Sequence, residues 1–520
     1  MKGLDTGCNL SSVPVDEGGQ HRRNIGYLAV PDLPIVYPCF AHHDCTHNQL
    51  VSIRGRVCGE TKYQPNPVQM ARLNKYMRRL GRSMKRVGHW DLDDVVQHYH
   101  GTKRARYGKA ADKYRANGLT KDDAAVEMFI KCEKIKFSPS KQNPDPRAIQ
   151  FRDPVYSVVL ATYLKPIEEV VYQMRGNRLN GLPSTRVIGK GLNQGQRATL
   201  LRKKWDSFVR PVCLSLDASR FDQHVSYAHL QAEHALYLQL NNDPEFARLL
   251  SWQLVNRVKT TRGIRYKTRG KRMSGDMNTA LGNCVIMVSQ LGLYFEDRDI
   301  KWDCLDDGDD ILVIVEAEYA QLLRDELPGH FAELGMDLKV ENDTTVFEQI
   351  EWCQCRPVAV DGGWTLIRSP AKVLSGALVG PKWVQMKSES SRRALANTIG
   401  LCEAILNRGI PVLSAFAESI IRNARTSRQV RVDQADQLIY RVRRELGKSW
   451  MSSIPAVTTT PISDETRLSF SRAFDVSVDD QMHWEHYLSK WVINFDEPHL
   501  QPVPVNVTNW TWEAVDVERY

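Results

Sequence analysis

Apolar residues recur with two different periods along this chain, and these periods indicate where its helices and strands lie. Met70, Leu73, Met77 and Leu80 are spaced three and four apart, which predicts a helix from Pro67 with a basic outer surface. The same spacing predicts further helices at 229–262, 276–291, 317–334, 374–378, 392–407, 411–425, 432–446 and 475–490. The last five of these predict a separate helical lobe near the end of the chain.

Shorter segments show the period of two that strands have. Alternation or short apolar runs predict strands at 129–137, 148–151, 212–216, 336–340 and 350–357. The clearest case is the stretch 301–316, KWDCLDDGDDILVIVE, in which two apolar runs flank a turn. Gly308 follows Asp307 in that turn, and an Asp-Gly pair favours a tight hairpin because glycine takes a positive φ at little cost. Helices and strands together indicate an α/β (α+β) fold.

The hairpin turn carries carboxylates on both sides of its glycine. Asp306 and Asp307 precede Gly308, and Asp309 and Asp310 follow it. Like charges this close raise one another's pKa unless a cation lies among them, and Mg²⁺ or Mn²⁺ prefers such oxygen ligands. A solvated acidic tip is the alternative. A calcium loop is excluded, because its register would put apolar residues where oxygen ligands are required.

Composition narrows the class of protein. The chain has 520 residues, 42% hydrophobic and 25% charged, which is enough for a large core and two or three lobes. No apolar run approaches the roughly 20 residues of a membrane span, and the start lacks a signal-peptide pattern. The 11 scattered cysteines favour a reducing, intracellular compartment. The net charge of +9 indicates a polyanionic partner, although a solvated basic face is the simpler alternative.

Two basic segments have the chemistry of nucleic-acid and phosphate binding. The stretch 99–115 interleaves cations with tyrosines, and its candidate nucleic-acid contacts are Lys103, Arg104, Arg106 and Tyr107. Cations neutralise phosphates and aromatics stack on bases, so this stretch suits a single-stranded track, although a plain basic surface helix fits equally well. Farther along, two strand-like segments joined by a proline-rich loop carry Lys131, Lys134, Arg147 and Arg152. These four could clamp a triphosphate through charge-assisted hydrogen bonds.

Two further segments supply polar side chains. The strand at 212–216 delivers Asp217 at its end, and Asp222 follows just past the turn. Such a pair can offer one carboxylate to a metal and one to a sugar hydroxyl, while a helix N-cap at Asp222 or Ser219 is the structural alternative. A second segment opens with Ser274 and Gly275, and it continues into a predicted helix on which Asp276, Thr279 and Asn283 share a face. This loop and helix suit a nucleotide.

Two groups of residues that include cysteines are candidate metal ligands. The first group is Cys39, His42, His43, Cys45 and His47. The second is Cys353 and Cys355, which would share one face of a strand at 350–357. Neither group has a second ligand pair at the spacing of a zinc site, so packing is favoured over metal binding in both. The tail after Glu497, with Trp510 and Trp512, is expected to be loosely structured or docked on a neighbour.

From about Tyr37 to His486, the chain resembles the viral RNA-dependent RNA polymerases of tombusvirus and carmovirus type, and it is also similar to those of umbraviruses. The segments that carry the resemblance are LSLDASRFDQHV (214–225), SGDMNTALGN (274–283), LDDGDD (305–310), EWCQC (351–355), KCEK, PRAIQFRDPVY and YLKPIE. Their joint occurrence in this order is specific, whereas each alone is not. The resemblance implies a right hand of fingers, palm and helical thumb. The implied parts are an N-terminal extension (1–60), fingers (61–205), palm (206–230), a fingers insertion (231–273), palm (274–356), and thumb with tail (357–520).

The resemblance also implies roles for the residues already identified. Asp217 and Asp309 would hold two Mg²⁺ or Mn²⁺ ions, with Asp310 as an outer ligand. Recognition of the ribose 2′-hydroxyl would fall to Asp222, Ser274, Thr279 and Asn283, with Gly275 beside them. The basic segment of Lys131, Lys134, Arg147 and Arg152 would lie above the nucleotide. Lys339 would protonate the departing pyrophosphate, although a surface salt bridge fits as well. Asp306 and Asp307 depart from the expected pattern, which has neutral residues before the glycine.

The function implied is RNA-directed synthesis of RNA for a positive-strand RNA virus, with release of pyrophosphate and without need of a primer. Expected partners are single-stranded template and nascent RNA, NTPs, and an upstream viral replication protein that attaches the complex to membranes in the host cytoplasm. A reverse transcriptase is the alternative enzyme, but it would carry a bulky residue at the Asp222 position. A non-catalytic RNA-binding protein is the alternative of another class, and it would tolerate alanine at Asp309.

Overall fold

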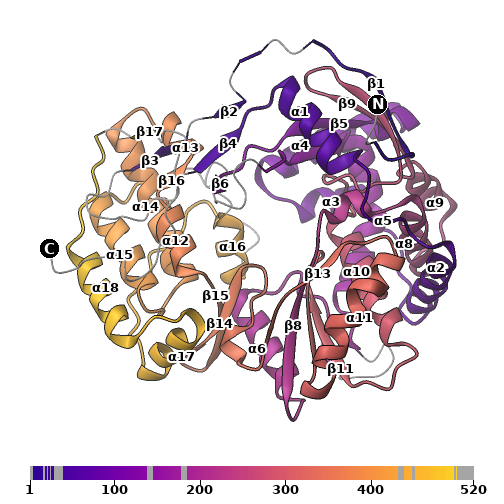
Figure 1. Cartoon of the computed structure of the whole chain (residues 1–520). Helices are drawn as coiled ribbons and strands as arrows, with labels where there is room; N and C mark the ends of the chain where they lie inside the picture. Colours follow the sequence, from indigo (N-terminus) through magenta and orange to yellow (C-terminus); the bar gives the residue numbers. More distant parts are fainter. Residues whose placement is uncertain are drawn as a thin grey trace.

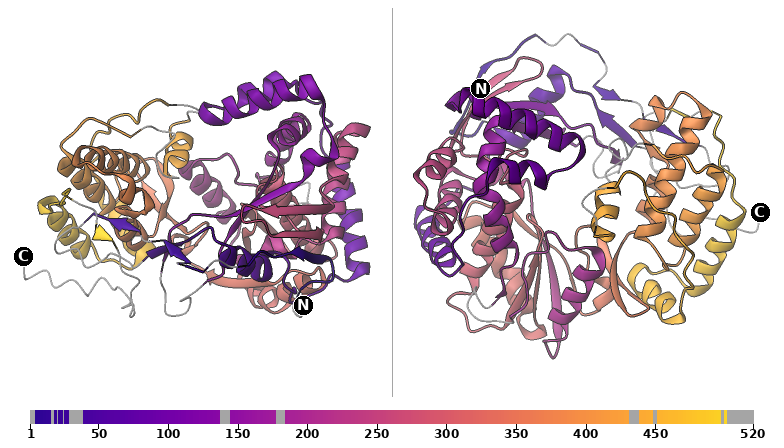
Figure 2. Two further views of the ribbon diagram at one scale, coloured as in Figure 1. Left: turned by 90° about the horizontal axis from the view of Figure 1, so that it is seen from above. Right: turned by 180° about the vertical axis from the view of Figure 1, so that it is seen from behind.

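The computed structural model describes residues 4–15, 18–19, 21–23, 25–28, 39–136, 144–176, 184–430, 438–447, 451–496 and 499–500. The predictions for 432–437, for the side chain of Cys39 and for the aromatic tail from Pro502 lie outside this set. Two lobes form a ring, one built on two large sheets and the other on C-terminal helices (Figures 1 and 2). No helix within the described ranges is long and apolar enough to cross a membrane.

A four-stranded antiparallel sheet lies at the base of the first lobe. Its strands are β11 (Trp302–Asp306), β12 (Asp310–Glu316), β8 (Pro211–Ala218) and β13 (Leu338–Thr344), in that spatial order. The predicted hairpin at 301–316 and the strand before Asp217 are thereby confirmed. Both faces of the central strands are buried, so alternate residues enter different cores. Helices α10 (Thr279–Phe295) and α11 (Ala320–Glu333) cover one face, and α6 (Gln194–Trp205) covers the other.

A five-stranded sheet forms the upper part of the same lobe. Its strands, in spatial order, are β1 (Cys8–Ser12), β10 (Arg265–Arg269), β9 (Val255–Thr260), β5 (Val126–Ile130) and β7 (Ala148–Arg152). The predicted helix at 229–262 is therefore wrong after Ser251. Helices α8 (Tyr227–Leu240) and α9 (Pro244–Ser251) are followed by β9, in which alternate residues are buried. The helical spacing of the preceding segment hid that period of two.

Helices surround these sheets. The predicted amphipathic helix is α2 (Pro67–Arg82), which buries Met70, Leu73, Met77 and Leu80 and packs against α8. Asn66 caps it by accepting a hydrogen bond from the Val68 amide, 2.9 Å away. The remaining helices of this lobe are α1 (Thr46–Ser52), η1 (Ile53–Val57), α3 (Leu92–His98), α4 (Gly101–Asn117), η2 (Lys121–Ala124), α5 (Pro154–Tyr172), α7 (Phe221–His224), η4 (Ala317–Tyr319) and η5 (Phe347–Gln349).

The C-terminal lobe has a hydrophobic core of its own, which supports the prediction of a separate helical lobe. Its helices are α12 (Pro370–Gly376), α13 (Pro381–Gln385), α14 (Glu389–Leu406), α15 (Leu413–Ala424), α16 (Leu438–Glu445), α17 (Asp464–Phe474) and α18 (Val478–Lys490). Helix α17 was not predicted. A hairpin of β14 (Cys355–Val360) and β15 (Gly363–Arg368) joins this lobe to α6.

The prediction that Cys353 and Cys355 share a strand face is wrong. Cys353 and Gln354 have φ values of 51° and 60°, so they form a tight turn closed by hydrogen bonds between Trp352 and Cys355. Strand β14 begins only after that turn. The turn points Cys353 toward the acidic hairpin and leaves Cys355 in a core.

Short N-terminal strands link the two lobes. Strand β3 (Gly26–Tyr27) pairs with β16 (Val379–Gly380) and β17 (His499–Leu500) of the C-terminal lobe. Strand β4 (Cys39–His42) pairs with β2 (Arg22–Arg23) and with β6 (Ile135–Lys136) of the first lobe. These pairings close the ring across its upper side (Figure 1).

Candidate active site

The hairpin between β11 and β12 sets acidic side chains beside the end of β8. Gly308 has a φ of 107°, which a residue with a Cβ adopts only with strain, so the turn depends on this glycine. Cross-strand register places Asp310 directly opposite Asp217, and the Ala218 amide donates to the Asp309 carbonyl over 3.2 Å. The sequence therefore separates these carboxylates by more than ninety positions, and sheet pairing brings them together.

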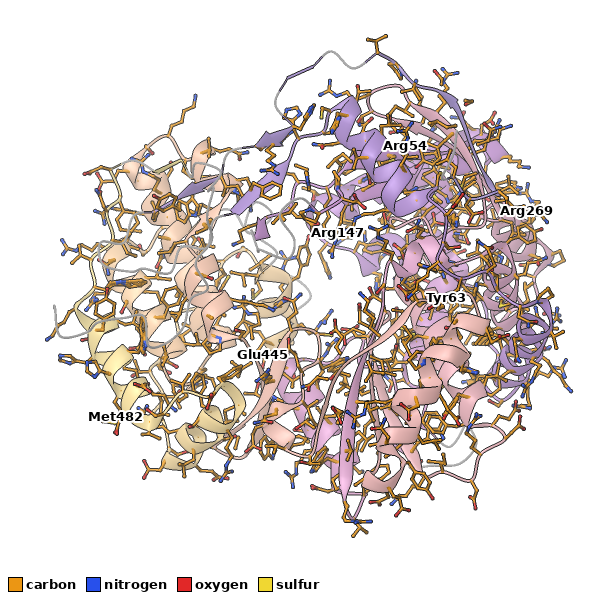
Figure 3. All side chains as sticks on the ribbon, in the orientation of Figure 1. Arg54, Tyr63, Arg147, Arg269, Glu445 and Met482 are labelled. Atoms are coloured by element: carbon orange, nitrogen blue, oxygen red, sulfur yellow. The ribbon has the colours of Figure 1, made fainter. Side chains whose placement is uncertain are left out.

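A cavity of about 430 Å³ lies above this end of the sheet. Its floor includes Asp217 and Asp309, and Asp222, Ser274 and Asn283 line it as well. Its cationic lining residues are Arg56, Lys131, Arg147 and Arg220. Figure 3 shows Arg147 on the side of the first lobe that faces the centre of the ring. A site lined by both carboxylates and cations suits an anion that reaches the protein together with a divalent cation.

Asp310 lies at the edge of this acidic group. Burial raises the pKa of its carboxyl to about 7, and the nearby carboxylates of Asp309, Asp307 and Asp217 act in the same direction. One hydrogen bond opposes them, because the amide of Cys353 donates to Asp310 Oδ2 over 2.8 Å. The site thus holds carboxylates whose mutual repulsion a cation would relieve.

The two carboxylates before Gly308 have different surroundings. Asp307 forms ion pairs with Lys190 at 2.5 Å and Arg197 at 2.8 Å. Burial opposes ionisation of Asp307, yet these two cations hold the pKa of its carboxyl below the usual value. Asp306 is fully buried, and burial raises its pKa well above the usual value. The departure from the expected pattern therefore adds no free charge to the cavity.

Asp222 and Asn283 meet at the wall of the cavity. The Asn283 amide nitrogen donates to Asp222 Oδ1 over 3.1 Å, and the Asn283 amide oxygen accepts from Arg272 Nε over 3.0 Å. Burial raises the pKa of Asp222 to about 6, against the hydrogen bond from Asn283 and the charge of Arg272. Asp222 lies inside the short helix α7, whose N-cap is Arg220, so the N-cap alternative for Asp222 is wrong.

The serine and glycine before α10 attach this segment to β7. Ser274 Oγ donates to the Ala148 carbonyl over 3.0 Å and accepts from the Gln150 amide over 3.1 Å. The Gly275 amide donates to the Gln150 carbonyl over 2.7 Å, and a Cβ at Gly275 would overlap that carbonyl. Ser274 lines the cavity, whereas Gly275 lies behind it.

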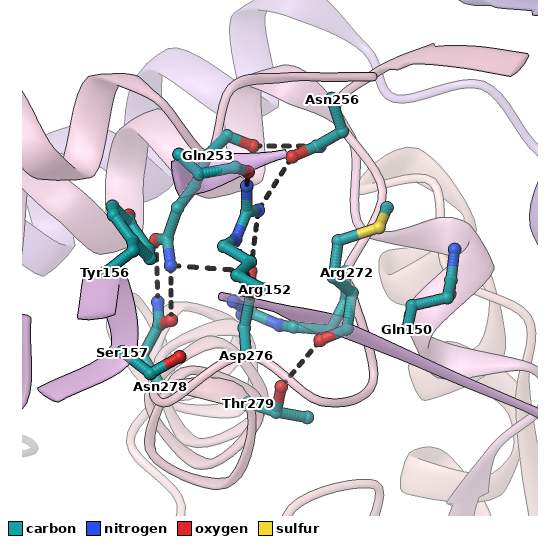
Figure 4. A network of polar contacts seen from close by, with 12 residues as sticks. Gln150, Arg152, Tyr156, Ser157, Gln253, Asn256, Arg272, Asp276, Asn278 and Thr279 are labelled. Carbon is teal, nitrogen blue, oxygen red and sulfur yellow. Dashed lines mark hydrogen bonds and ion pairs between the residues drawn. The ribbon is translucent and has the colours of Figure 1, made fainter. Parts of the chain in front are cut away.

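Thr279 and Asp276 do not continue the row that the sequence suggested. The Thr279 hydroxyl donates to the Met273 carbonyl over 2.8 Å, at the first turn of α10. Asp276 precedes the helix and forms a buried ion pair with Arg152 (Figure 4). Of the three residues predicted to share a helix face, Asn283 alone is among the residues that line the cavity.

The four cations predicted to clamp a triphosphate divide into two pairs. Lys131 and Arg147 line the cavity and flank Glu133, to which Lys131 pairs at 2.9 Å. Lys134 lies elsewhere, where its ammonium donates to the Gly376 and Val379 carbonyls of the C-terminal lobe.

Arg152 is the fourth of these cations, and its guanidinium is buried. It binds Asp276, the Ala124 carbonyl and Asn256, as Figure 4 shows in part. The geometry gives Lys134 and Arg152 structural contacts in place of a position in the cavity.

Sequence reasoning missed Arg56 and Arg220. Arg220 Nη2 pairs with Asp145 at 2.8 Å, and Arg56 Nε donates to the Asp145 carbonyl over 2.8 Å. The place of Arg220 between Asp217 and Asp222 in the sequence could have indicated it. Arg56 had no comparable signal, because its segment, η1, reaches the cavity only through tertiary packing.

The remaining predicted residues lie outside the cavity. Lys339 is opposite Asp217 on β13, and its side chain is exposed. Lys103, Arg104 and Arg106 are exposed on α4, where Lys103 Nζ lies 4.3 Å from the ring centre of Tyr99. Tyr107 is 8% exposed and packs in the core, so its ring has no free face for a base in this conformation.

The donor chemistry of the site fits a divalent cation. Within the ranges that the structure describes, no three Asp, Glu, His or Cys side chains converge into a group that could hold a metal ion unaided, and this includes the histidines and cysteines at 42–47. Mg²⁺ is commonly held by one or two carboxylates together with substrate phosphates. Asp217 and Asp309 could supply that part of the ligand set, with phosphate oxygens and water completing it.

Comparison with known proteins agrees with this site. The family model described as viral RNA dependent RNA polymerase matches residues 37–496. Similar curated proteins, each called RNA-directed RNA polymerase, come from Groundnut rosette virus (36% identical, 75% of this chain, 45% of that protein) and Melon necrotic spot virus (33%, 87%, 56%). Another comes from Tomato bushy stunt virus, strain Cherry (30%, 92%, 57%). The chain spans about half the length of these relatives. Because the family match covers most of its residues, this chain belongs to the viral RNA-dependent RNA polymerases.

Proposed function

We propose that this chain copies an RNA template into RNA for a positive-strand plant virus. The observation that carries the proposal is that Asp217 and Asp309 line the same cavity as Lys131 and Arg147. A nucleoside triphosphate needs such a site, with cations for its phosphates and carboxylates for the cation that accompanies it. The relatives that carry the polymerase name match this chain along most of its length.

The reaction joins the 3′-hydroxyl oxygen of an RNA strand to the α-phosphorus of an incoming nucleotide, with loss of the hydroxyl proton and departure of pyrophosphate. Two Mg²⁺ or Mn²⁺ ions, when bound, would lower the pKa of that hydroxyl and take up charge on the triphosphate. Asp217 and Asp309 provide the carboxylates of the site, and Asp310 adds charge beside them. Lys131 and Arg147 orient the triphosphate. Lys339 is the candidate proton donor for pyrophosphate.

Selection of ribonucleotides is assigned to the wall of the cavity. Asp222 and Asn283 form a hydrogen-bonded pair there, with Ser274 on the same wall. A site that hydrogen-bonds a hydroxyl rejects a substrate that lacks it, because the buried polar groups are then left without a partner. The pair therefore supports recognition of the ribose 2′-hydroxyl.

The division of the chain follows the two lobes. The sheet with the acidic hairpin serves as the palm (206–230 and 274–356). Strands β5, β7, β9 and β10 of the five-stranded sheet belong to the fingers (61–205 and 231–273), and its fifth strand, β1, belongs to the N-terminal extension (1–60). The C-terminal helices serve as the thumb (357–520). Template and nascent RNA would pass between these lobes, with the exposed cations of α4 on the approach. This route is consistent with the ring seen in Figure 1.

We also propose that the chain works in a replication complex attached to membranes. The relatives are longer than this chain, which is consistent with a larger replication protein or a separate partner that brings the complex to membranes of the host cytoplasm. Initiation without a primer is proposed as well. It would be observed as full-length product from a template that carries no annealed primer.

The test measures incorporation of labelled ribonucleotides on a short single-stranded RNA with Mg²⁺. The intact chain is compared with Asp309→Ala, and Asp299→Ala serves as the matched control because Asp299 is exposed at the opposite end of β11 from the hairpin turn. Synthesis is expected from the intact chain and the control. A loss of at least roughly 10³-fold, on the order of 4 kcal/mol, is expected for Asp309→Ala.

RNA binding is measured on the same samples. Retained binding with lost synthesis in Asp309→Ala supports a catalytic role for that carboxylate. RNA binding without synthesis by any of the proteins would favour the non-catalytic alternative. Incorporation of deoxyribonucleotides as readily as ribonucleotides would favour a reverse transcriptase.

A further inference from the structure

Behind Asp222 and Asn283 lies a buried ion pair that no step of the proposed chemistry uses. Arg272 and Glu233 have side chains 1% and 0% exposed, and Arg272 Nη1 lies 3.2 Å from Glu233 Oε1 with Nη2 on the other oxygen. Glu233 also accepts from Tyr237 over 2.9 Å and from Asn278 over 2.7 Å. A charge pair so fully buried needs this complete set of partners.

Arg272 contacts both members of the pair that lines the cavity. Its backbone amide donates to the Asp222 carbonyl over 3.0 Å, and its Nε donates to Asn283 Oδ1 over 3.0 Å. A guanidinium only donates, so it fixes which end of the Asn283 amide faces it. The amide nitrogen of Asn283 must then face Asp222, where it donates over 3.1 Å. Asp222 lines the cavity, where a carboxylate oxygen can accept from a ligand hydroxyl.

The position of the ion pair depends on a glycine in helix α10. A Cβ at Gly282 would overlap both Arg272 Nη2 and Glu233 Oε1. The helix therefore leaves room for the guanidinium and carboxylate directly against its backbone, one residue before Asn283. This is a second, independent indication that the pair is built around Asn283.

Figure 4 shows further hydrogen bonds that attach the start of helix α10 to its neighbours. Asn278 bonds Gln253, and Asp276 bonds Arg152, so the start of α10 is attached to β7 and to the segment before β9. Because Asn278 also donates to Glu233, the ion pair belongs to a continuous set of buried hydrogen bonds. Such a set favours one arrangement of its members over others.

We propose that Arg272 and Glu233 are positioning residues that set the preference of this site for ribose over deoxyribose. The inference rests on the proposed polymerase function. Arg272 acts through Asn283, since its Nε holds the amide in the orientation that presents Asp222 to a ribose 2′-hydroxyl. Glu233 acts through Arg272 by fixing the plane of the guanidinium. Neither residue is among those that line the cavity.

The experiment measures kcat/KM for ATP and for dATP in single-nucleotide extension of a primed RNA template. In Arg272→Lys the charge beside Glu233 remains, but an ammonium cannot hold both Glu233 and Asn283 in the geometry of the guanidinium. The kcat/KM for ATP is expected to fall at least about tenfold while that for dATP changes little, because only the ribonucleotide uses the oriented pair. Gly282→Ala is expected to shift the same ratio, since it displaces the ion pair without removing a charge.

The matched control removes another buried ion pair. Lys204 and Asp303 are 0% and 1% exposed and lie 2.6 Å apart, and neither lines the cavity. The double variant Lys204→Met with Asp303→Asn is expected to leave the ratio of the two kcat/KM values unchanged, whatever it does to stability. The double variant Glu233→Gln with Arg272→Met, which leaves no unpaired charge, is expected to lower the ratio and covers the case in which Arg272→Lys fails to fold.

An unchanged ratio in Arg272→Lys, Gly282→Ala and the Glu233 double variant would overturn the inference while leaving the proposed function intact. A fall in the control ratio of the same size would also overturn it, because the effect would then follow from any loss of a buried pair. Failure of the intact chain to extend the RNA with either nucleotide would instead count against the proposed function.

Discussion

Two aspartates precede Gly308 and two follow it, but the two pairs have different surroundings. Before the glycine, Asp306 is buried in the core and Asp307 is held by two cations. After it, Asp309 lines the cavity, and Asp310 lies opposite Asp217 and accepts a hydrogen bond from the Cys353 amide. The two carboxylates before the glycine therefore have structural surroundings, whereas Asp309 is among the residues that line the cavity. The division comes from the partners that each side meets in the fold, since the side chains are identical.

This contrast explains how so much negative charge fits in one turn. Lys190 and Arg197 come from the segment that runs beside the hairpin, where Gly189 donates to the Asp306 carbonyl over 2.7 Å. Their charge offsets Asp307, so that the repulsion that remains is concentrated at the cavity. A cation arriving with a nucleotide would then meet the carboxylates that line the cavity.

The largest expected effect comes from the cavity side. Asp309→Asn keeps the size of the side chain and removes its charge, so RNA synthesis is expected to fall by at least roughly 10³-fold, about 4 kcal/mol of transition-state stabilisation. Stability is expected to stay constant or rise, because one of several crowded carboxylates is lost. Synthesis rates and urea unfolding midpoints measure the two effects. A large loss of stability would show that Asp309 belongs with the structural pair.

The next largest effect is a loss of stability, and it is expected for Asp307, which precedes Gly308. Asp307→Ala leaves Lys190 and Arg197 without their carboxylate, and Arg197 is only 5% exposed. The free energy of unfolding is expected to fall by about 2–3 kcal/mol, below the value for a fully buried pair because Lys190 is partly open to water. Urea unfolding measures the change, with Asp361→Ala as control because Asp361 is exposed in the turn between β14 and β15. If Asp307→Ala and Asp361→Ala are equally stable, Asp307 does not have the structural role that separates it from Asp309.

A pH-dependent effect is expected at Asp306. Burial raises the pKa of its carboxyl well above the unfolded value, so between these two values the folded chain keeps a proton that the unfolded chain has released. Each unit of rising pH in that window therefore costs the native chain up to about 1.4 kcal/mol, whereas Asp306→Asn does not titrate. Unfolding free energies of both proteins at pH 5 and pH 6 measure the difference. If the difference in unfolding free energy between the two proteins does not grow with pH, the pKa of the buried Asp306 carboxyl is not raised.

The smallest effect is expected at Cys353. Its backbone amide binds Asp310, and its thiol lies 3.3 Å from Asp307 Oδ2. Cys353→Ala keeps the amide and loses the thiol, so stability is expected to fall by no more than about 1 kcal/mol and the rate of synthesis to change by less than about twofold. Circular dichroism on heating and the synthesis assay provide the measurements. A drop in synthesis comparable to that of Asp309→Asn would assign the thiol a role that packing does not explain.

Much of the site was predictable because its residues lie at the ends of strongly patterned elements. The strand before Asp217 and the hairpin around Gly308 are apolar runs with clear turns, and both formed as predicted. The helix predicted over 255–260 was wrong, because a six-residue strand directly after helix α9 is too short to show its period of two clearly. The four basic residues near 131–152 were predicted as one clamp, and the fold divides them.

The sequence by itself determined which chemistry was available: carboxylates on a hairpin, cations at or near the ends of short strands, and an amide one turn into a helix. The periods of its apolar residues also determined most of the elements that carry them. Only the tertiary structure decided which carboxylate meets a cation, which is buried and which faces the cavity. The reason is physical, since the free energy of a charge depends on burial and on partners within a few ångströms. For Asp307 those partners are Lys190 and Arg197, which are far away in the sequence and come close only when the sheet and α6 have packed.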